Sequence, residues 1–427
     1  MERLHSLPVK AKKVIGIGSQ RKLRGNITAF IVVLSLPAMA SADVQTDTAP
    51  SAGQIKTTWS ASTGIGYDNN VYQSPRSPYA DYAALPAGSN PIITPRKDSG
   101  FFVPYEASLA ISKKRELGSR LLGSASLEGK FYPAGGSLNN ANEYDLSLGG
   151  GSEYALSDEE KSSRTLYVGA LFEKHENVYV DHESGSGKNT TMTGAGIQGR
   201  NSYTGIGVEA KYTRRVGDIG YGLHGQYILN DYQDPGVFSQ FDHSYFALDA
   251  EAGVPINPNN ALNLSYDHTV RDYSGRHARD AQGIESSANP LLAYTYNGIG
   301  AKWSSRISPD WMLFLDYDHT RRNDNFQSYD ESRENRYGIL LSYKQGRLTT
   351  RMALHHWERD YPNGFAFDVA GQGSKYYSGN ILKLRAESEQ TGKASLWGEL
   401  LYRAQNATDL RYDYSRMLVM AGVTWTY

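Results

Sequence analysis

Apolar and polar positions alternate along most of the chain. From residue 57 to residue 427, segments of about ten residues place apolar or aromatic side chains at every second position. In the segment Leu121–Phe131, for example, Ser124 and Glu128 fall on one face of a strand, and the other face carries Leu121, Ala125, Leu127 and Phe131. Such a strand offers one face to lipid and one to water, which is typical of a transmembrane β-barrel.

The connections between these segments alternate between short and long. Short connections rich in turn-forming residues lie at 113–116, 157–160, 217–218, 257–259, 308–310, 346–347 and 391–393. Longer ones lie at 68–100, 133–142, 175–201, 232–242, 273–292, 323–330, 361–373 and 406–412. We therefore expect an all-β, transmembrane, antiparallel up-and-down barrel of about 16 strands, or about 14 or 18 if one hairpin is miscounted. The short turns would face the periplasm and the long loops the exterior.

A soluble all-β fold is the alternative, because strands packed on a core also alternate. Against a propeller, no motif recurs at the length of a blade. Against a sandwich, the charged residues gather on the face opposite the apolar one. A helical membrane protein is excluded, since the chain lacks several runs of about 20 apolar residues.

The N-terminus has the pattern of a secretory signal peptide. A basic stretch precedes the apolar segment 27–36, and the small residues 38–42 follow it. We expect cleavage after Ala42, with Ala40 as the second choice. The predicted organisation is a signal peptide at 1–42, a short periplasmic segment at 43–56 and an outer-membrane barrel at 57–427. An uncleaved amphipathic helix is the alternative.

Composition narrows the classes of function. Lysine and arginine (44) nearly balance aspartate and glutamate (45), so no global field attracts nucleic acid. Cysteine is absent, which excludes disulfides, thiolate metal sites and cysteine nucleophiles. The 31 tyrosines and 43 glycines suit strands that lie at a membrane interface. We expect no cofactor and no metal site.

The chain ends in an aromatic strand. Gly422, Trp425 and Tyr427 stand where the C-terminal signal of outer-membrane proteins has a glycine and two aromatic residues, and Met420 departs from that pattern. This end resembles the signal that the barrel-assembly machinery recognises. It predicts insertion into the outer membrane of a Gram-negative bacterium, with membrane lipid and that machinery as partners.

The alternation also predicts which charges face the interior. The acidic wall, on the first half of the barrel, consists of Glu106, Glu128, Asp145, Glu209, Asp249, Glu251 and Asp267. The basic wall, on the second half, consists of Lys302, Arg322, Arg336, Arg351, Lys383, Arg385, Arg403 and Arg416. Opposed walls would set a field across a wet pore, which favours polar or dipolar solutes. The alternative is that these charges pair across strands and fill the interior.

An open interior is favoured because about 16 strands enclose more volume than side chains fill. The first long loop, residues 68–100, is a candidate plug, because it holds several prolines. Its residues Tyr72, Tyr79 and Tyr82 could stack on sugars. The loop 175–201 competes for the role of constriction.

No catalytic constellation stands out. His355 and His356 with Glu358, His319 near Asp316 and Asp318, and the run 181–183 are candidates only by proximity in sequence. Histidine is common in loops and at barrel interfaces, so we expect no enzymatic activity and no catalytic residues.

The first strand and its exit carry a resemblance. The segment Trp59–Tyr72 contains the phrase G-x-G-Y-D-N-N-V-Y. With the chain length and the aromatic C-terminus, this phrase resembles the outer-membrane β-barrel porin type 2 family, which is associated with exopolysaccharide gene clusters. The resemblance implies a barrel that passes, or helps to pass, a surface polysaccharide. Because only segment 43–56 would precede the barrel, a separate periplasmic export partner is expected.

Three functions remain. The first is an outer-membrane channel for saccharide, most of all a secreted exopolysaccharide. The second is a diffusion porin for small polar nutrients, and the third is a non-conducting adhesin or structural barrel that acts through its loops. The solute, the direction of transport and homo-oligomerisation stay open.

Overall fold

The computed structural model describes residues 53–82, 88–95, 97–115, 118–133, 138, 141–159, 162–176, 202–233 and 241–427. The predicted signal peptide, most of segment 43–56 and most of the loop 175–201 lie outside the described residues. Among the residues that the structure describes, no helix has the length and apolar content needed to cross a membrane.

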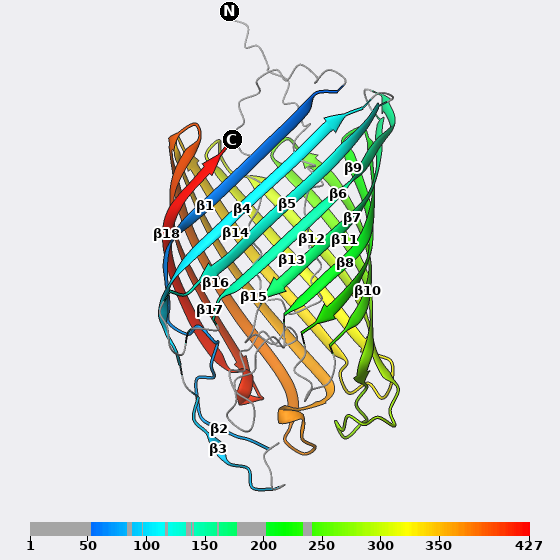
Figure 1. The fold of residues 1–427 in the computed structure, drawn as a ribbon, viewed down its shortest axis with the longest axis vertical. Coiled ribbons are helices and arrows are strands. Elements are labelled where there is room, and N and C mark those ends of the chain that lie inside the picture. The colour runs from blue at the N-terminus through cyan, green and yellow to red at the C-terminus, as the bar shows by residue number, and fades with distance from the viewer. Residues whose placement is uncertain are drawn as a thin grey trace, which may run out of the picture.

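Sixteen strands form one closed antiparallel barrel, so the predicted fold class and strand number are confirmed (Figure 1). They are β1 (Ile55–Asp68), β4 (Gly100–Lys114), β5 (Ser119–Phe131), β6 (Glu143–Glu159), β7 (Ser162–Glu176), β8 (Tyr203–Val216), β9 (Ile219–Tyr232), β10 (His243–Asn257), β11 (Asn260–His277), β12 (Leu291–Arg306), β13 (Trp311–Asp324), β14 (Ser332–Gln345), β15 (Leu348–Phe365), β16 (Ser374–Thr391), β17 (Ala394–Ala407) and β18 (Tyr414–Thr426). Each barrel strand pairs with its neighbours in sequence, and β1 closes the ring against β18.

The connections alternate as the sequence predicts. Tight turns lie at the end of the barrel where the C-terminus is, and the longer loops lie at the other end (Figure 1). Gly217 and Gly346 adopt φ values of 58° and 55° in two of these turns, a conformation that glycine reaches without steric cost. The first loop contains a short hairpin of β2 (Tyr79–Ala80) and β3 (Ile92–Ile93).

Several strands run further into the predicted loops than the alternation indicates. β11 continues to His277 after a register shift beyond Asp272, and β15 continues to Phe365 after a shift beyond Tyr361. A β-bulge breaks the period of two, so the alternation ends before the strand does. Short 3-10 helices, η4 (Ala366–Asp368) and η5 (Leu410–Tyr412), follow in two of the loops.

The outer face of the barrel is apolar. Large exposed apolar residues on this face include Ile65, Leu109, Val168, Val208, Leu229, Leu264, Ile299, Ile339, Leu354 and Val419. Aromatic pairs lie near both ends of the strands: Trp311 packs on Tyr343 at the turn end with ring centroids 4.6 Å apart, and Tyr67 packs on Phe101 at the loop end at 5.3 Å. An apolar band between aromatic girdles is the surface that a barrel presents to a lipid bilayer.

Two glycines face each other where the barrel closes. Gly64 of β1 lies directly opposite Gly422 of β18. A Cβ added at Gly422 would clash with the carbonyl oxygen of Thr63 and with the ring of Trp397. The backbone of the closing strand therefore approaches its neighbour at a distance that only glycine permits. This gives Gly422 a packing role, while its recognition by the assembly machinery, with Trp425 and Tyr427, remains a prediction.

We expect Gly422→Ala to lower the free energy of unfolding by about 1–3 kcal/mol, because the added methyl forces β1 and β18 apart. Urea unfolding in detergent micelles, followed by tryptophan fluorescence, measures the change. Gly398→Ala on the adjacent strand is the matched control, because its added Cβ would meet only the Met420 carbonyl oxygen at 3.9 Å. Equal stability of the two variants would contradict the close approach at the seam.

Candidate functional site

The interior face of the barrel carries every residue of the predicted acidic wall. Glu106 lies directly opposite Glu128, and Glu128 lies opposite Asp145. Residues that lie opposite each other in an antiparallel pair point to the same face. Asp249 likewise lies opposite Asp267. Glu209 lies opposite Gln226, and Glu251 lies opposite Ser265. Both of these partners belong to the interior face.

The predicted basic wall also lies on the interior face. Arg351 lies opposite Arg385, and Arg403 lies opposite Arg416. Each other member lies opposite a residue of the interior face on the next strand. The pairs are Lys302 with Asp316, Arg322 with Tyr296, Arg336 with Asp318 and Lys383 with Leu401.

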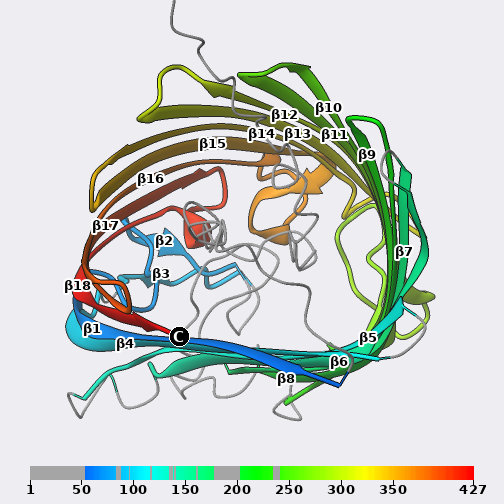
Figure 2. The same cartoon turned by 90° about the horizontal axis from the view of Figure 1, so that it is seen from above.

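The two walls occupy the two halves of the ring and meet where β11 pairs with β12. The acidic residues come from strands β4 to β11, and the basic residues come from β12 to β18. Figure 2 shows β4, β5, β6 and β8 on one side of the opening and β14, β15 and β16 on the other. The structure therefore brings both predicted sets together around one lumen, with opposite signs facing each other. The role of these charges in transport remains a prediction.

Like charges lie side by side on both walls. Glu106, Glu128 and Asp145 follow one another across three strands, and Arg351 lies beside Arg385. Directly opposed like charges destabilise a sheet, so a fold under selection for stability alone would not gather them. Such rows are expected where a channel attracts or orients polar solutes.

The acidic wall is open to solvent near β4 and β5. The inward-facing Glu106, Ser108 and Ser124 are exposed, although their side chains point into the barrel. The hydroxyls of Ser60 and Ser108 lie 2.7 Å apart on this surface. Solvent therefore reaches the interior beside a surface of small hydroxyl side chains and a carboxylate.

Other parts of the acidic wall are bonded to histidine. His224 lies 3.1 Å from a carboxylate oxygen of Glu209 and 3.6 Å from one of Asp249. The His175 ring contacts the Asp145 carboxylate through Nδ1. In this part of the acidic wall, some interior carboxylates have partners on neighbouring strands, which agrees in part with the hypothesis that the interior charges pair.

The basic wall is more tightly packed. Glu399 is buried between two cations, with Lys383 Nζ at 3.0 Å and Arg385 Nη1 at 3.2 Å from its carboxylate oxygens. Glu334 is buried in the same way between Arg336 and Arg359. The Glu334 cluster contains one carboxylate and two guanidinium groups. Arg385 of the other cluster has a second carboxylate partner in Glu387 at 3.5 Å, so paired interior charges account for part of this wall too.

The segment Asp68–Ser74 binds the first loop to the inner wall. Asp68 has no exposed surface, and its carboxylate accepts hydrogen bonds from Arg416 Nε at 2.8 Å and from the hydroxyl of Tyr132 at 3.1 Å. The Asn70 amide donates to the carbonyl oxygens of Ser74 and Ser415 at 3.0 and 2.9 Å. The D-N-N phrase therefore has a structural role: it joins the loop to β18.

The three tyrosines of the candidate plug lie in different surroundings. Tyr72 is only 3% exposed and packs in a cluster with Phe102 and Leu418 on the inner wall, so its ring is covered and has no free face for a sugar. Tyr79 is half-buried, in the hairpin β2–β3. The Tyr82 ring packs on Phe367 of the β15–β16 loop at 5.0 Å. Whether the loop obstructs the pore remains a prediction.

An aromatic ladder that the sequence analysis missed crosses the inner wall toward the loop end. It consists of His175, Tyr203, Tyr232, His243, Tyr273, Tyr294 and Tyr296, whose successive ring centroids lie 5.0–6.0 Å apart. Arg322 extends it, with its guanidinium 4.5 Å from the centroid of Tyr294. Most of these rings are buried, so the ladder stiffens the wall and offers little surface for stacking. The available signal was an aromatic residue near the loop end of successive strands.

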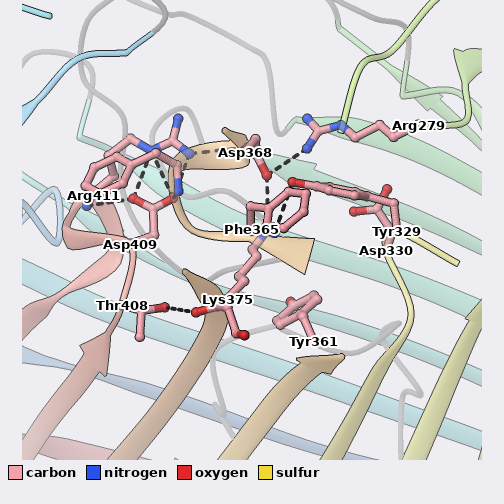
Figure 3. Close-up of polar contacts among 12 residues, drawn as sticks. Arg279, Tyr329, Asp330, Tyr361, Phe365, Asp368, Lys375, Thr408, Asp409 and Arg411 are labelled. Carbon is pink, nitrogen blue, oxygen red and sulfur yellow. Dashed lines mark hydrogen bonds and ion pairs between the residues drawn. The ribbon is translucent and has the colours of Figure 1, made fainter. Parts of the chain in front are cut away.

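A second missed cluster lies among the loops at the mouth (Figure 3). Asp368 of the β15–β16 loop accepts from Arg279 Nη1 at 2.8 Å, from Arg411 Nη2 at 3.2 Å and from Lys375 Nζ at 3.5 Å. Arg411 also pairs with Asp409 at 2.6 Å. The cations come from three different parts of the chain, so no local sequence pattern predicts that they lie close together.

The histidines considered for catalysis lie on both faces of the barrel wall. His319 points outward and lies 2.9 Å from Asn335 Oδ1, while Asp316 and Asp318 face inward. His356 also points outward, 3.0 Å from Asn380 Oδ1 and 3.2 Å from a carboxylate oxygen of Glu358, whereas His355 lies on the inner face opposite Gly338. The run 181–183 lies outside the described residues. Within the described part of the chain, no group of three or more histidine or acidic side chains is arranged to hold a metal ion.

No model of a known protein family matches the chain, and no curated protein matches it. The resemblance to the porin type 2 family therefore stays a prediction. Among solved structures, the chain is similar to the outer-membrane expressed OmpT of Vibrio cholerae, with 10% identity over 88% of this chain and 99% of that chain and a TM-score of 0.45.

Two further similarities are equally remote. An anion-selective porin from Comamonas acidovorans shows 12% identity over 88% of this chain and 100% of its own, with a TM-score of 0.44. A bacterial polysaccharide outer membrane secretin shows 8% identity over 86% of this chain and 97% of its own, with a TM-score of 0.40.

Proposed function

We propose that the protein is an outer-membrane channel for saccharides and serves the export of a surface polysaccharide. The observation that carries this proposal is the lumen, where an acidic and a basic wall face each other and a solvent-exposed surface of serine and glutamate lies between the strand ends. A transverse field with hydroxyl and carboxylate groups suits hydrated, dipolar solutes and disfavours apolar ones.

The location follows from the outer surface. The exposed apolar band and its aromatic girdles need a bilayer, and an antiparallel barrel of 16 strands is the form that single-chain proteins of the bacterial outer membrane take. The aromatic C-terminus with Gly422, Trp425 and Tyr427 supports delivery by the barrel-assembly machinery.

The saccharide class rests on the polar interior, and polysaccharide export rests on the phrase in Trp59–Tyr72. A polymer driven outward would need a periplasmic partner to deliver it. A diffusion porin for small polar nutrients is the alternative use of the same lumen, and only the solute distinguishes the two.

Single-channel recording tests the proposal. The full chain is expressed in a Gram-negative host, purified from the outer membrane and inserted into a planar bilayer, with and without added oligosaccharides. We expect ohmic openings that oligosaccharides block in a concentration-dependent way. Openings that no sugar blocks would indicate a nutrient porin, and a folded barrel that never conducts would leave an adhesin or structural barrel.

Charge variants test the role of the two walls in the same recordings. Glu106→Gln with Glu128→Gln should shift the reversal potential in a KCl gradient toward anions, and Arg351→Gln with Arg385→Gln should shift it toward cations. Arg214→Gln, on the outer face, is the matched control and should leave it unchanged. Shifts of the same sign for both double variants would contradict the opposed walls.

A further inference from the structure

One carboxylate at the mouth holds three cations from separate loops and strands. Arg279 follows β11, Lys375 begins β16 and Arg411 lies in η5, yet all three contact Asp368 (Figure 3). The side chains of Asp368 and Arg279 are each 21% exposed, and those of Arg411 and Lys375 are 17% and 12% exposed. The cluster is therefore partly open to solvent from the mouth.

The backbone that delivers Asp368 is strained. Asp368 and its neighbour Phe367 adopt φ values of 55° and 57°, in the left-handed region that aspartate tolerates but a bulky side chain such as that of phenylalanine rarely occupies. The fold maintains this strain while it places a carboxylate among the three cations. Observed strain of this kind is common at ligand-binding and switching segments.

The cations have further contacts that do not involve Asp368. Arg279 lies over the ring of Tyr329 at 5.7 Å, Lys375 over Tyr361 at 4.8 Å and Arg411 over Tyr412 at 5.3 Å. Cation–π contacts of this kind hold the charged groups in place without a carboxylate. The basic site is therefore preorganised and would survive the departure of Asp368.

The pKa values of the two arginines agree with a permanently charged basic site. Burial lowers the pKa of the Arg279 guanidinium, but Asp368 and Asp330 raise it by more, so the pKa lies above its ordinary value. The pKa of Arg411 is also well above its ordinary value, because Tyr412, Asp409 and Asp368 outweigh burial. Both groups therefore stay charged, which a site for an anionic ligand requires.

We propose that Arg279, Lys375 and Arg411 form a binding site for a carboxylate-bearing saccharide, and that Asp368 occupies this site in the unliganded protein. This rests on the proposed function as a saccharide channel. A uronic-acid residue of the sugar supplies the carboxylate that replaces Asp368, and its ring hydroxyls meet the surrounding aromatic and polar side chains. Asp368 thereby acts as an internal competitor, which keeps the mouth ordered until an acidic sugar arrives.

Binding measurements test this on the purified full chain in detergent. Isothermal titration calorimetry with a uronic-acid hexasaccharide compares the wild type with Asp368→Ala and with Asp368→Asn, which keeps the size of the side chain. Removal of an internal competitor that fills most of the sites should tighten binding about tenfold. A neutral glucose hexasaccharide should bind equally to all three proteins.

Two further variants separate this site from a general effect of charge. Asp413 is a second carboxylate near the mouth, and it pairs with Arg76 of the first loop. Asp413→Ala therefore removes one negative charge without touching Asp368, and it should change uronate affinity less than twofold. Adding Arg411→Gln to Asp368→Ala should reverse the gain. Equal gains for Asp368→Ala and Asp413→Ala, or no gain for either Asp368 variant, would overturn the proposal.

Failure of this inference differs visibly from failure of the proposed function. Calorimetry detects the site whether or not the barrel conducts. If neutral sugars block the openings but the Asp368 variants bind uronate no more tightly, the acidic-sugar site is rejected and the channel is kept. Tighter uronate binding in a barrel that never conducts would remove the channel and leave the site.

Discussion

Replacing Asp68 with alanine is expected to lower the free energy of unfolding by about 3–5 kcal/mol, because it leaves the buried Arg416 without its carboxylate partner. The same substitution removes the acceptor for the Tyr132 hydroxyl and for the backbone N–H of Asn70. The loss of one partner costs the full desolvation of the groups that remain, which exceeds the net value of the bonds themselves.

The measurement is urea unfolding in detergent micelles, with Arg120→Ala as the control. Arg120 pairs with Glu153, but its side chain is 53% exposed, so that substitution should cost less than about 1 kcal/mol. Asp68→Asn should fall between the two, since an amide oxygen still accepts hydrogen bonds but carries no charge. A difference below 1 kcal/mol between Asp68→Ala and Arg120→Ala would contradict the buried pair.

Asp68 also has a consequence for the first loop. Because the loop is joined to β18 through Asp68 and Asn70, Asp68→Ala should speed trypsin cleavage after Arg76 and Lys97, which lie beyond the attachment. Unchanged cleavage in a folded variant would mean that the contact of Arg76 with Asp413 holds the loop by itself.

The strands and their faces were predictable because both signals are local. The period of two in a segment such as Leu121–Phe131 follows from the pleat, and turns such as Gly217–Asp218 follow from the conformations that glycine and aspartate permit. Once strand positions and turns are known, the meander leaves little freedom in how neighbours pair. The inward set of acidic and basic residues follows directly.

The contacts among the loops were not predictable, because they depend on where distant segments meet. Arg279, Asp368 and Arg411 come from loops separated by long stretches of chain, and each alone has the pattern of a solvated charge. The phrase at Asp68–Asn70 was noticed, but its role as an attachment depends on Arg416, which lies at the other end of the sequence. Bulges beyond Asp272 and Tyr361 hid the true strand ends for a different reason, because they break the period of two.

Replacing Glu334 with alanine is the second large expected effect, again a loss of about 3–5 kcal/mol in the free energy of unfolding. Glu334 and Arg359 are each 3% exposed, and Arg359 Nε donates to Glu334 Oε2 at 2.6 Å. Without Glu334, the buried guanidinium of Arg359 and the partly buried guanidinium of Arg336, on neighbouring strands, repel each other. Glu358→Ala, on the outer face of the next strand, should cost under 1 kcal/mol, because its carboxylate is 45% exposed beside His356.

A triple variant separates stability from selectivity in this cluster. Glu334→Leu with Arg336→Met and Arg359→Met replaces the whole buried ion cluster with apolar side chains of similar length, a change that is often neutral or stabilising. We expect its unfolding free energy to return to within about 2 kcal/mol of the wild type, while the reversal potential shifts toward cations. If stability returns and selectivity does not change, the cluster only fills space. If both expectations hold, the fold retains these charges for the solute that passes them, since an apolar core would serve the barrel as well.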